Sequence, residues 1–240
     1  DPLVVIDPTD PERNVAAVLS GDNLARLQHH ARDLLAEPRT DPFFPAEPSP
    51  IDASGVREHV RRRDTAPAAV AFDAPDLVDD QLYPQLRRSV AGIERELDGL
   101  GFDVLRAATF ATEHGERGGD RRAVLLVELA DGDLPAIERH EGPPVHVRDH
   151  AAGFYGKYAD DPDAYGPFVV DGRYVVERER DPAERDVVAV LESDRIFDAA
   201  LGARVESALE RGYDVFAGEA VATLADEFGT DLRGYFEPSV

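Results

Sequence analysis

A short stretch near the N-terminus carries the residues whose types and spacing best suit contact with a ligand. The segment DPTDPERNVAA (residues 7–17) places two carboxylates, Asp7 and Asp10, and the guanidinium of Arg13 on a proline-stiffened turn that leads into a helix. Arginine offers five N–H donors in a fixed fork, so a rigid turn that holds it still can read a base edge or bind a phosphate. The alternative is structural: Asp7 and Asp10 cap the helix and Arg13 pairs with one of them.

Arginines gather again in the middle of the chain. Arg57 and Arg61 lie four residues apart, which places them on one face of the helix expected there. Such a stripe is typical of phosphate contact along an RNA stem, but ion pairing with the surrounding carboxylates explains it equally well. The remaining arginines of this group are Arg62, Arg63, Arg87 and Arg88.

A third group combines basic and aromatic side chains in the last third of the chain. One expected helix carries Arg148, Tyr155, Lys157 and Tyr158, and Arg173 and Tyr174 follow it. Aromatic rings at such a surface can stack on exposed bases, or they can belong to the core. We expect Tyr174 to be a core residue and leave both interpretations open for Tyr155.

Catalytic and metal-binding patterns do not emerge from the sequence. The pairs Asp131/Asp133 and Asp161/Asp163 lie in Gly- or Pro-containing turns, and pairs of this kind arise by chance in so acidic a chain. The histidines His140, His146 and His150 only weakly suggest a metal site, and we expect them to be solvated loop residues. With no nucleophile elbow or Gly-rich phosphate loop, we assign no catalytic residue and no metal ligand to this chain.

Composition indicates the solvent in which the protein works. The 240 residues carry a formal charge of -23, no cysteine, and only one lysine, Lys157, among 26 basic residues. Dense surface carboxylates are typical of proteins that function in multimolar salt, where the Debye length falls to about 3 Å. Long-range repulsion from phosphates is then screened, so the net charge argues neither for nor against RNA binding. No apolar run is long enough to span a membrane.

The first 50 residues predict a short strand, two helices and a linker. Residues 3–6 predict a short buried strand, residues 14–19 a short helix, and Ser20 the cap of a second helix that Pro38 ends. That helix has an apolar face, and residues 38–50 form a proline-rich linker whose Phe43 and Phe44 should dock on a core. An apolar strand at residue 3 with no initiator Met and no basic leader before it indicates a chain cut within a domain. The apolar face consists of Leu24, Leu27, Ala31, Leu34 and Leu35.

The rest of the chain predicts an α+β fold. Helix 54–63 comes first, and strand 67–73, helix 84–97, strand 102–112, a turn over 113–120 and strand 121–130 then give most of a ferredoxin-like unit. Further on, residues 134–158 should be helical on both sides of a Gly-Pro-Pro break, and strands 168–170 and 173–179 should be joined at Asp171-Gly172. Helices are expected over 182–191, 196–211 and 219–228, all on one face of the sheets.

Several of these segments together resemble the archaeal-type (class I) CCA-adding enzymes, which are CCA tRNA nucleotidyltransferases. The similar segments are VIDPTDPERNVAAVLS (5–20), DNLARLQHHARDLLAEP (22–38), DPFFP (41–45), APDLVDDQLYPQLRRS (74–89) and GPFVVDGRYVVER (166–178). They occur in the family's order over nearly the whole chain, and the first and fourth are long. The chain is therefore identified as the C-terminal portion of such an enzyme, without its catalytic head and from a halophile.

The resemblance implies a set of expectations about architecture and role. Residues 1–45 would end the central neck domain, residues 46–135 would form a ferredoxin-like body, and residues 136–240 the tail with the C-terminal helical part of the body. Arg13 would face the incoming nucleotide, with Asn14 fixing the turn. RNA contacts would come from the residues Arg57, Arg61, Arg148, Tyr155, Lys157 and Arg173.

The resemblance also implies substrates and partners. The intact protein would add C, C and A to tRNA 3′ ends from CTP and ATP, in the cytoplasm, with Mg²⁺ held by the absent head. This chain would bind the acceptor and T stem-loop half of the tRNA, would be inactive alone, and leaves a homodimer open. Two alternatives remain: a stand-alone ferredoxin-like RNA-binding module, and a non-catalytic subunit of a separate nucleotidyltransferase.

Overall fold

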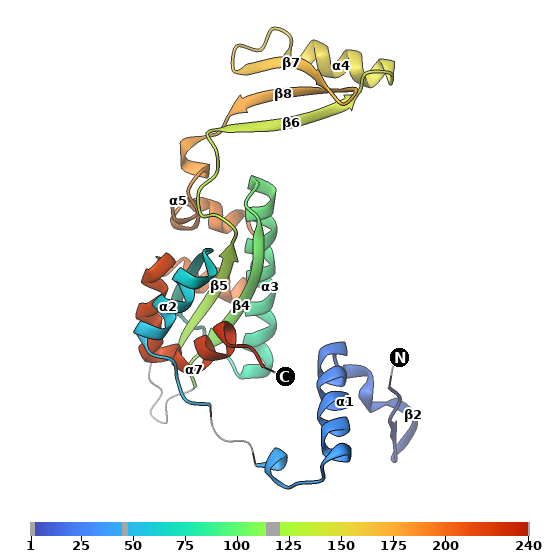
Figure 1. Ribbon diagram of the computed structural model, residues 1–240, viewed down its shortest axis with the longest axis vertical. Helices are drawn as coiled ribbons and strands as arrows, with labels where there is room; N and C mark the ends of the chain where they lie inside the picture. The colour runs from blue at the N-terminus through green and yellow to red at the C-terminus, as the bar shows by residue number, and fades with distance from the viewer. Residues whose placement is uncertain (1–2, 45–47, 114–120, 240) are drawn as a thin grey trace. The chain divides into compact units, whose positions relative to one another are not determined.

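The computed structural model describes residues 3–44, 48–113 and 121–239, and its contacts divide the chain into two compact units. The first unit is Asp1–Ser49 with Glu237–Val240, and the second is Pro50–Phe236. The second unit holds both larger sheets, which Figure 1 shows with the helices that accompany them.

The first unit is a small hairpin followed by a helix. Its elements are β1 (Ile6–Asp7), β2 (Asp10–Asn14), the 3-10 helix η1 (Val15–Val18), α1 (Gly21–Ala36) and the 3-10 helix η2 (Asp41–Phe43). The Ser20 hydroxyl accepts a hydrogen bond from Asn23 N at 3.2 Å, which confirms the predicted N-cap. The residues after Asp7, expected to form only a turn, return as β2 because Asp10 pairs with Asp7 and Asn14 with Ile6.

The predicted burial of this unit is wrong within the described residues. Ile6 is 52% exposed and Leu35 on α1 is 81% exposed, and Phe43 and Phe44, expected to dock on a core, are 64% and 80% exposed. The physical reason is that a two-stranded hairpin and one helix cannot form a layer over their own apolar side chains. Leu24 alone among the five predicted helix-face residues is buried.

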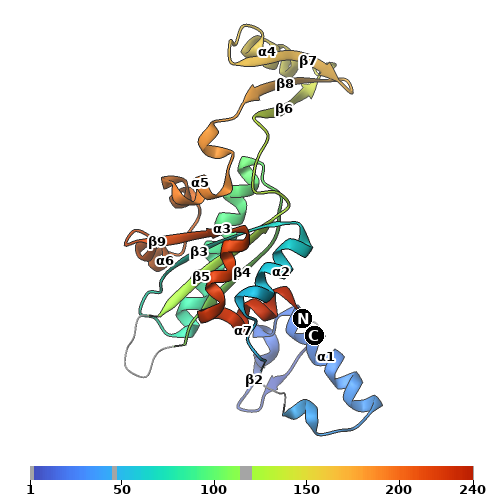
Figure 2. The ribbon, with the colours of Figure 1, turned by 60° about the vertical axis from the view of Figure 1, so that its left-hand side comes forward.

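The main sheet of the second unit has the ferredoxin-like strand order. The strand order is β4-β5-β3-β9 with every pair antiparallel, and Figure 2 labels the four strands side by side. The predicted β-α-β-β run is therefore confirmed. The fourth strand, β9, was not predicted, and it pairs with β3 from far along the chain. The elements are β3 (Ala66–Asp73), α3 (Asp79–Leu100), β4 (Val104–Ala111), β5 (Arg122–Leu129) and β9 (Tyr213–Ala217).

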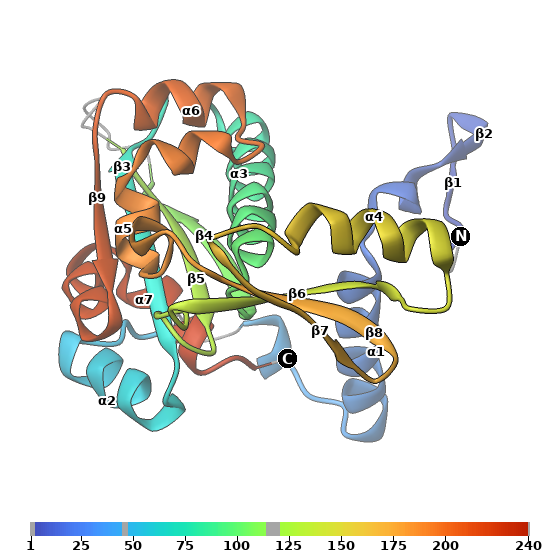
Figure 3. The same ribbon diagram turned by 90° about the horizontal axis from the view of Figure 1, so that it is seen from above.

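Helices cover both faces of this sheet, which corrects the expectation of helices on one face only. Figure 3 shows α3 and α6 on one side of the strands and α2 and α7 on the other. Residues of β3 alternate between the two cores: Val70 and Phe72 pack in one, Ala69 and Ala71 in the other. The helical elements are α2 (Ala53–Arg63), α5 (Val187–Glu192), α6 (Ala203–Leu209), α7 (Ala225–Phe236) and the 3-10 helices η3 (Pro182–Glu184), η4 (Asp194–Asp198) and η5 (Gly218–Leu224).

Helix α3 is longer than predicted and packs closely against the loop before α6 at one glycine. It starts at Asp79, five residues before the predicted start, and contains Pro84. Gly92 lies so close to the loop before α6 that a Cβ there would be 2.8 Å from the Ala200 carbonyl oxygen. Gly101 ends the helix with φ +103°, a conformation that favours glycine.

The second sheet of this unit has three strands in the order β6-β8-β7 and one helix, α4. The predicted hairpin turn at Asp171-Gly172 is confirmed, with φ 50° and 77° at the two residues. The expectation of a helix before the Gly-Pro-Pro break is wrong, because this segment pairs with β8 as β6. The elements are β6 (Ile137–Pro144), α4 (Arg148–Tyr158), β7 (Ala164–Val170) and β8 (Arg173–Glu179).

The other predicted helices each divide into two elements: 182–191 becomes η3 and α5, and 219–228 falls in η5 and α7, which runs on to Phe236. The segment 196–211 divides into η4 and α6, because Gly202 packs against Gln85 and starts a new helix. The predicted turn over 113–120 lies, apart from Glu113, outside the described residues. No helix in the described ranges is long and apolar enough to cross a membrane.

Candidate nucleotide-facing and RNA-binding surfaces

Asn14 holds the N-terminal hairpin and the helix after it together. Its side-chain oxygen accepts hydrogen bonds from Val5 N at 2.9 Å and Ala16 N at 3.0 Å, and its side-chain nitrogen donates to the Leu3 carbonyl at 3.3 Å. The same residue thus caps η1 and closes the hairpin. The turn that presents Arg13 is therefore fixed by side-chain hydrogen bonds.

Arg13 projects from this turn with its side chain 69% exposed. Its Nη1 atom lies 3.8 Å from Asp7 Oδ2, near the outer limit of an ion pair, and the Asp7 side chain is 16% exposed. Hydrogen bonds from the Thr9 backbone N–H and hydroxyl lower the pKa of Asp7, which keeps that carboxylate ionised. The structural alternative for Arg13 is thus realised in part, yet most of the guanidinium stays available to a ligand.

Arg57 and Arg61 lie about one turn apart on α2, as their spacing predicted. Arg61 Nε donates to the Arg57 carbonyl at 3.2 Å and also lies 3.4 Å from Glu219. Arg62 pairs with Glu58 at 3.8 Å, and both partners are about 70% exposed. These ion pairs are exposed and weak, so they do not prevent the same arginines from contacting a phosphate.

The last arginine of α2, Arg63, differs from its neighbours because it binds a fully buried carboxylate. Glu128 on β5 has 0% exposed side chain and accepts hydrogen bonds from Arg63 Nε at 2.6 Å and Arg106 Nη2 at 2.8 Å. Thr65 Oγ1 and the Tyr235 hydroxyl complete the set at 2.6 and 2.9 Å. We call these five residues the Glu128 cluster.

The electrostatics of the Glu128 cluster favour the ionised carboxylate. Burial by itself raises the pKa of Glu128, but the hydrogen bonds from Arg63, Thr65, Arg106 and Tyr235 outweigh it and lower the pKa from 4.5 to about 2. Burial and the neighbouring carboxylate raise the pKa of Tyr235. The cluster was not predicted, although one signal was visible: Glu128 is the only charged residue in the apolar run AVLLVEL.

Helix α4 contacts the three-stranded sheet and buries some of its aromatic side chains. Tyr158 is 4% exposed and Tyr155 is 48% exposed, so only Tyr155 offers a ring to the surface. Tyr174 is half-buried and stacks on Phe154, in agreement with the expected core role. His140, expected in a loop, lies instead on β6 with its ring 5.6 Å from that of Phe154.

The basic residues of α4 and β8 have different neighbours. Lys157 Nζ is 4.7 Å from the Tyr158 ring centroid, and Arg173 Nε donates to the Gly142 carbonyl at 3.0 Å. Arg148 is exposed at the first turn of α4. Arg148, Lys157 and Arg173 therefore belong to one small sheet-and-helix module, as the sequence pattern suggested.

In each aspartate pair the first side chain accepts a hydrogen bond within its own turn. Asp131 Oδ1 accepts from Asp133 N and Asp161 Oδ1 accepts from Asp163 N, both at 3.0 Å. In the described part of the chain, no group of three or more His, Cys, Asp and Glu residues is arranged to hold a metal ion.

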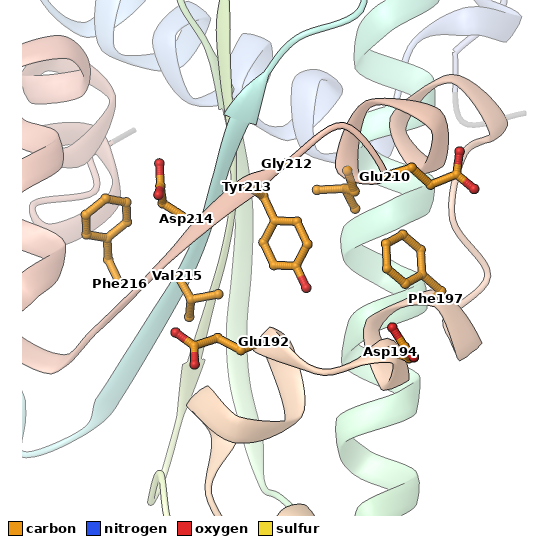
Figure 4. Close-up of a pocket in the computed structure, with 10 residues that line it drawn as sticks. Glu192, Asp194, Phe197, Glu210, Gly212, Tyr213, Asp214, Val215 and Phe216 are labelled. Atoms are coloured by element: carbon orange, nitrogen blue, oxygen red, sulfur yellow. The ribbon is translucent and has the colours of Figure 1, made fainter.

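An open depression beside β9 does not suit an anionic ligand. Figure 4 shows the carboxylates of Glu192, Asp194, Glu210 and Asp214 around it. The Tyr213 hydroxyl on the same wall donates to the Leu191 carbonyl at 2.9 Å. Four carboxylates repel a phosphate at contact distance and can only accept hydrogen bonds, so we assign this depression no role in nucleotide or RNA binding.

An α+β body with a ferredoxin-like sheet, a small second sheet and clustered arginines defines a class of candidate RNA-binding proteins, and comparison with known families narrows it. Residues 63–218 match the family model described as "CCA-adding enzyme, C-terminal domain", and residues 1–44 match "tRNA nucleotidyltransferase, second domain". The chain belongs to the CCA-adding enzyme family. The resemblance inferred from the sequence motifs is thereby confirmed.

Individual relatives agree with this assignment. The chain is 58% identical to a CCA-adding enzyme from Halorubrum lacusprofundi and 54% identical to one from Haloarcula marismortui, each over 99% of this chain and 52% of the relative. It is 34% identical to a CCA-adding enzyme from Methanosarcina mazei over 95% of this chain and 48% of the relative. The chain thus spans about half the length of the curated relatives it matches, and the haloarchaeal relatives agree with its acidic composition.

Proposed function

We propose that this chain is the tRNA-binding C-terminal part of a CCA tRNA nucleotidyltransferase, a protein that adds C, C and A to tRNA 3′ ends from CTP and ATP without a nucleic-acid template. The observation that carries the proposal is the family match over residues 63–218 together with the match over residues 1–44. The proposed role of this chain is to hold the acceptor and T stem-loop half of the tRNA and to complete the nucleotide pocket.

Arg13 is the residue we propose for the nucleotide. A pocket that selects a base without a template needs hydrogen-bond donors held in a fixed direction. The Asn14 and Asp7 hydrogen bonds fix the turn, and 69% of the Arg13 side chain is exposed, which supports this role. Asn14 contributes by positioning that turn.

The RNA contacts we propose come from two surfaces of the second unit. Arg57 and Arg61 would contact phosphates from α2, and Arg148, Tyr155, Lys157 and Arg173 would contact RNA from the three-stranded sheet and α4. In strong salt these contacts depend on short-range hydrogen bonds and stacking, because exposed charges separated by more than about 3 Å are screened.

Mg²⁺ is the metal we propose for the intact enzyme, where it would stabilise the attacking 3′-OH and the leaving pyrophosphate. The described residues do not fit such a site: the aspartate pairs cap turns, and no group of three or more metal-ligating side chains is found among them. We therefore derive no step of the transfer from this chain's residues and place the metal in the other half of the protein.

The division of the chain follows from the same proposal. Residues 1–45 would end the neck, residues 46–135 form most of the body, and residues 136–240 supply the tail and then return to the body. Support comes from β9, which joins the body sheet after the three-stranded sheet is complete. A cytoplasmic location belongs to the proposal because tRNA is the proposed substrate, and a homodimer stays a prediction.

The alternative of a stand-alone RNA-binding module is less well supported. Ferredoxin-like modules that read RNA do so on an open sheet face with exposed aromatic rings. In this chain the middle strands β3 and β5 are buried on both faces, so this sheet offers no such platform.

A transfer assay tests the proposal. The 240-residue chain is incubated in multimolar KCl with CTP, ATP, Mg²⁺ and a tRNA that lacks its 3′ CCA. We expect the tRNA to be bound and its length to stay unchanged. Nucleotide addition by this chain alone would contradict the assignment of catalysis to the other half, and absence of tRNA binding would contradict the proposed RNA-holding role.

A further inference from the structure

Two arginines of the Glu128 cluster reach the surface above a buried carboxylate. Arg63 ends α2 and Arg106 lies on the edge strand β4, and each guanidinium side chain is 32% exposed. Both groups bind Glu128: Arg63 through Nε and Nη2 at 2.6 and 3.2 Å, and Arg106 through Nε and Nη2 at 3.0 and 2.8 Å. One carboxylate therefore holds two guanidinium groups next to each other.

The Glu128 cluster has more positive than negative charge, and its arginines have N–H groups that Glu128 does not bind. Two guanidinium groups and one carboxylate give a local net charge of +1, because Thr65 and Tyr235 are neutral. Within the described ranges Arg63 Nη1 makes no hydrogen bond, and Arg106 Nη1 donates once, to the Tyr235 carbonyl at 3.2 Å. Each arginine therefore keeps N–H donors on Nη1 that Glu128 does not occupy and that an oxyanion can bind.

Both arginines are also rigid, which separates them from the other arginines of α2. Arg106 lies over the Tyr235 ring, 4.1 Å from its centroid, and Arg63 is held by a two-point hydrogen bond to a buried group. Arg61 and Arg62 instead form single, exposed ion pairs. A preorganised arginine loses less side-chain entropy on binding a ligand than a flexible one does.

We propose that Arg63 and Arg106, held by Glu128, form a preorganised contact for a phosphate of the RNA backbone. The inference rests on the proposed RNA-binding function and adds to it a site built on the last residue of α2 and the edge strand β4. A rigid contact of this kind suits strong salt, where binding depends on hydrogen-bond geometry more than on long-range attraction. Asp64, which follows Arg63, is an exposed carboxylate that could repel a phosphate. In strong salt this repulsion is screened beyond about 3 Å.

Binding of a tRNA that lacks its 3′ CCA to the full chain in multimolar KCl tests this inference. The variants Arg63→Gln and Arg106→Gln each remove a guanidinium and its charge and keep a polar side chain. We expect each to weaken RNA binding about tenfold, the loss of a charge-assisted contact to one phosphate.

Two control variants separate binding from stability. Gly92→Ala on α3 lies outside the Glu128 cluster, so it should lower the stability and change the RNA affinity by less than about twofold. Arg95→Gln makes the same charge change on α3, which covers the opposite face of the sheet, and should also stay within about twofold. If a Gln variant does not fold, the wild-type chain and the variant Arg63→Lys are compared instead by ethylation interference on the tRNA. The lysine variant should lose interference at one phosphate position at which the wild type shows it.

The outcomes distinguish the two levels of the proposal. Wild-type affinity in folded Arg63→Gln and Arg106→Gln would overturn the phosphate site, and so would an unchanged interference pattern in Arg63→Lys. If Arg61→Gln binds RNA more weakly in that case, the proposed RNA-binding function still stands. Failure of the wild-type chain to bind any tRNA would overturn both. Inorganic phosphate, at matched ionic strength, should displace the RNA no better than chloride does. Displacement that depends on Arg63 would show a free-phosphate site and overturn the RNA assignment.

Discussion

Replacing Glu128 with glutamine probes the buried carboxylate at the centre of the Glu128 cluster. The side chain keeps its shape, but the buried negative charge that holds Arg63 and Arg106 disappears. The pKa of Glu128 is about 2 against an ordinary value of 4.5, and about 2.5 pKa units correspond to about 3 kcal/mol of stabilisation near neutral pH. Removing one partner of a buried ion pair costs about 3–5 kcal/mol in other proteins, which agrees with this magnitude.

The pH dependence of this effect has a definite sign. Because the folded-state pKa of Glu128 lies below its unfolded-state pKa, its stabilisation is complete above about pH 4.5 and is lost as the pH falls towards about 2. The difference in unfolding free energy between the wild type and Glu128→Gln should therefore be about 3 kcal/mol at about pH 7 and should shrink steadily below about pH 4.5.

Urea unfolding at constant multimolar KCl, followed by far-UV circular dichroism because the chain has no tryptophan, measures this difference. Taking the wild type minus the variant cancels the effect of the many other carboxylates, which titrate in both proteins. A difference below about 1 kcal/mol at neutral pH, or one that stays constant on acidification, would refute the assigned role of the Glu128 charge.

Three further substitutions have expected outcomes. Gly92→Ala should lower the unfolding free energy by about 1–3 kcal/mol in thermal unfolding, because the new Cβ would lie 2.8 Å from the Ala200 carbonyl oxygen, whereas Gly99→Ala on the same helix meets nothing within 4 Å and should not destabilise. Asn14→Ala should speed amide hydrogen exchange at Val5 and Ala16, which lose their acceptor, and a cost well below about 1 kcal/mol for opening this turn would contradict the capping role. Arg13→Lys in the intact enzyme should reduce the preference for CTP and ATP over UTP and GTP about tenfold, because lysine lacks the planar fork of donors; unchanged selectivity would remove Arg13 from the nucleotide pocket.

The body sheet was predictable where local sequence and tertiary structure agree. The apolar runs of β3 and β5 and the apolar face of α3 gave the β-α-β-β order, and Asp171-Gly172 located a hairpin turn. The burial of both sheet faces was predictable from the same runs, since strands covered on two sides read as continuous apolar segments. The run AVLLVEL in β5 carries that signal.

Long-range pairing explains most of the errors. The five residues of β9 form a strand because β3 offers them a sheet edge, and β6 is a strand because β8 does, although its own sequence suggested a helix. The Glu128 cluster joins α2, β4, β5 and α7, so its members are adjacent only after folding. The N-terminal hairpin and α1 expose apolar side chains that sequence periodicity marked as buried, because periodicity identifies an apolar face without identifying what covers it.

The most direct test of the central claim compares three RNAs for binding to this chain in multimolar KCl. They are a tRNA that lacks its 3′ CCA, a minihelix of its acceptor and T stem-loop, and a hairpin of its anticodon arm. A chain that holds the acceptor and T half of tRNA should bind the minihelix as tightly as the whole tRNA, and the anticodon hairpin at least about tenfold more weakly. Equal affinity for the minihelix and the anticodon hairpin, or no binding of any of the three, would contradict the account.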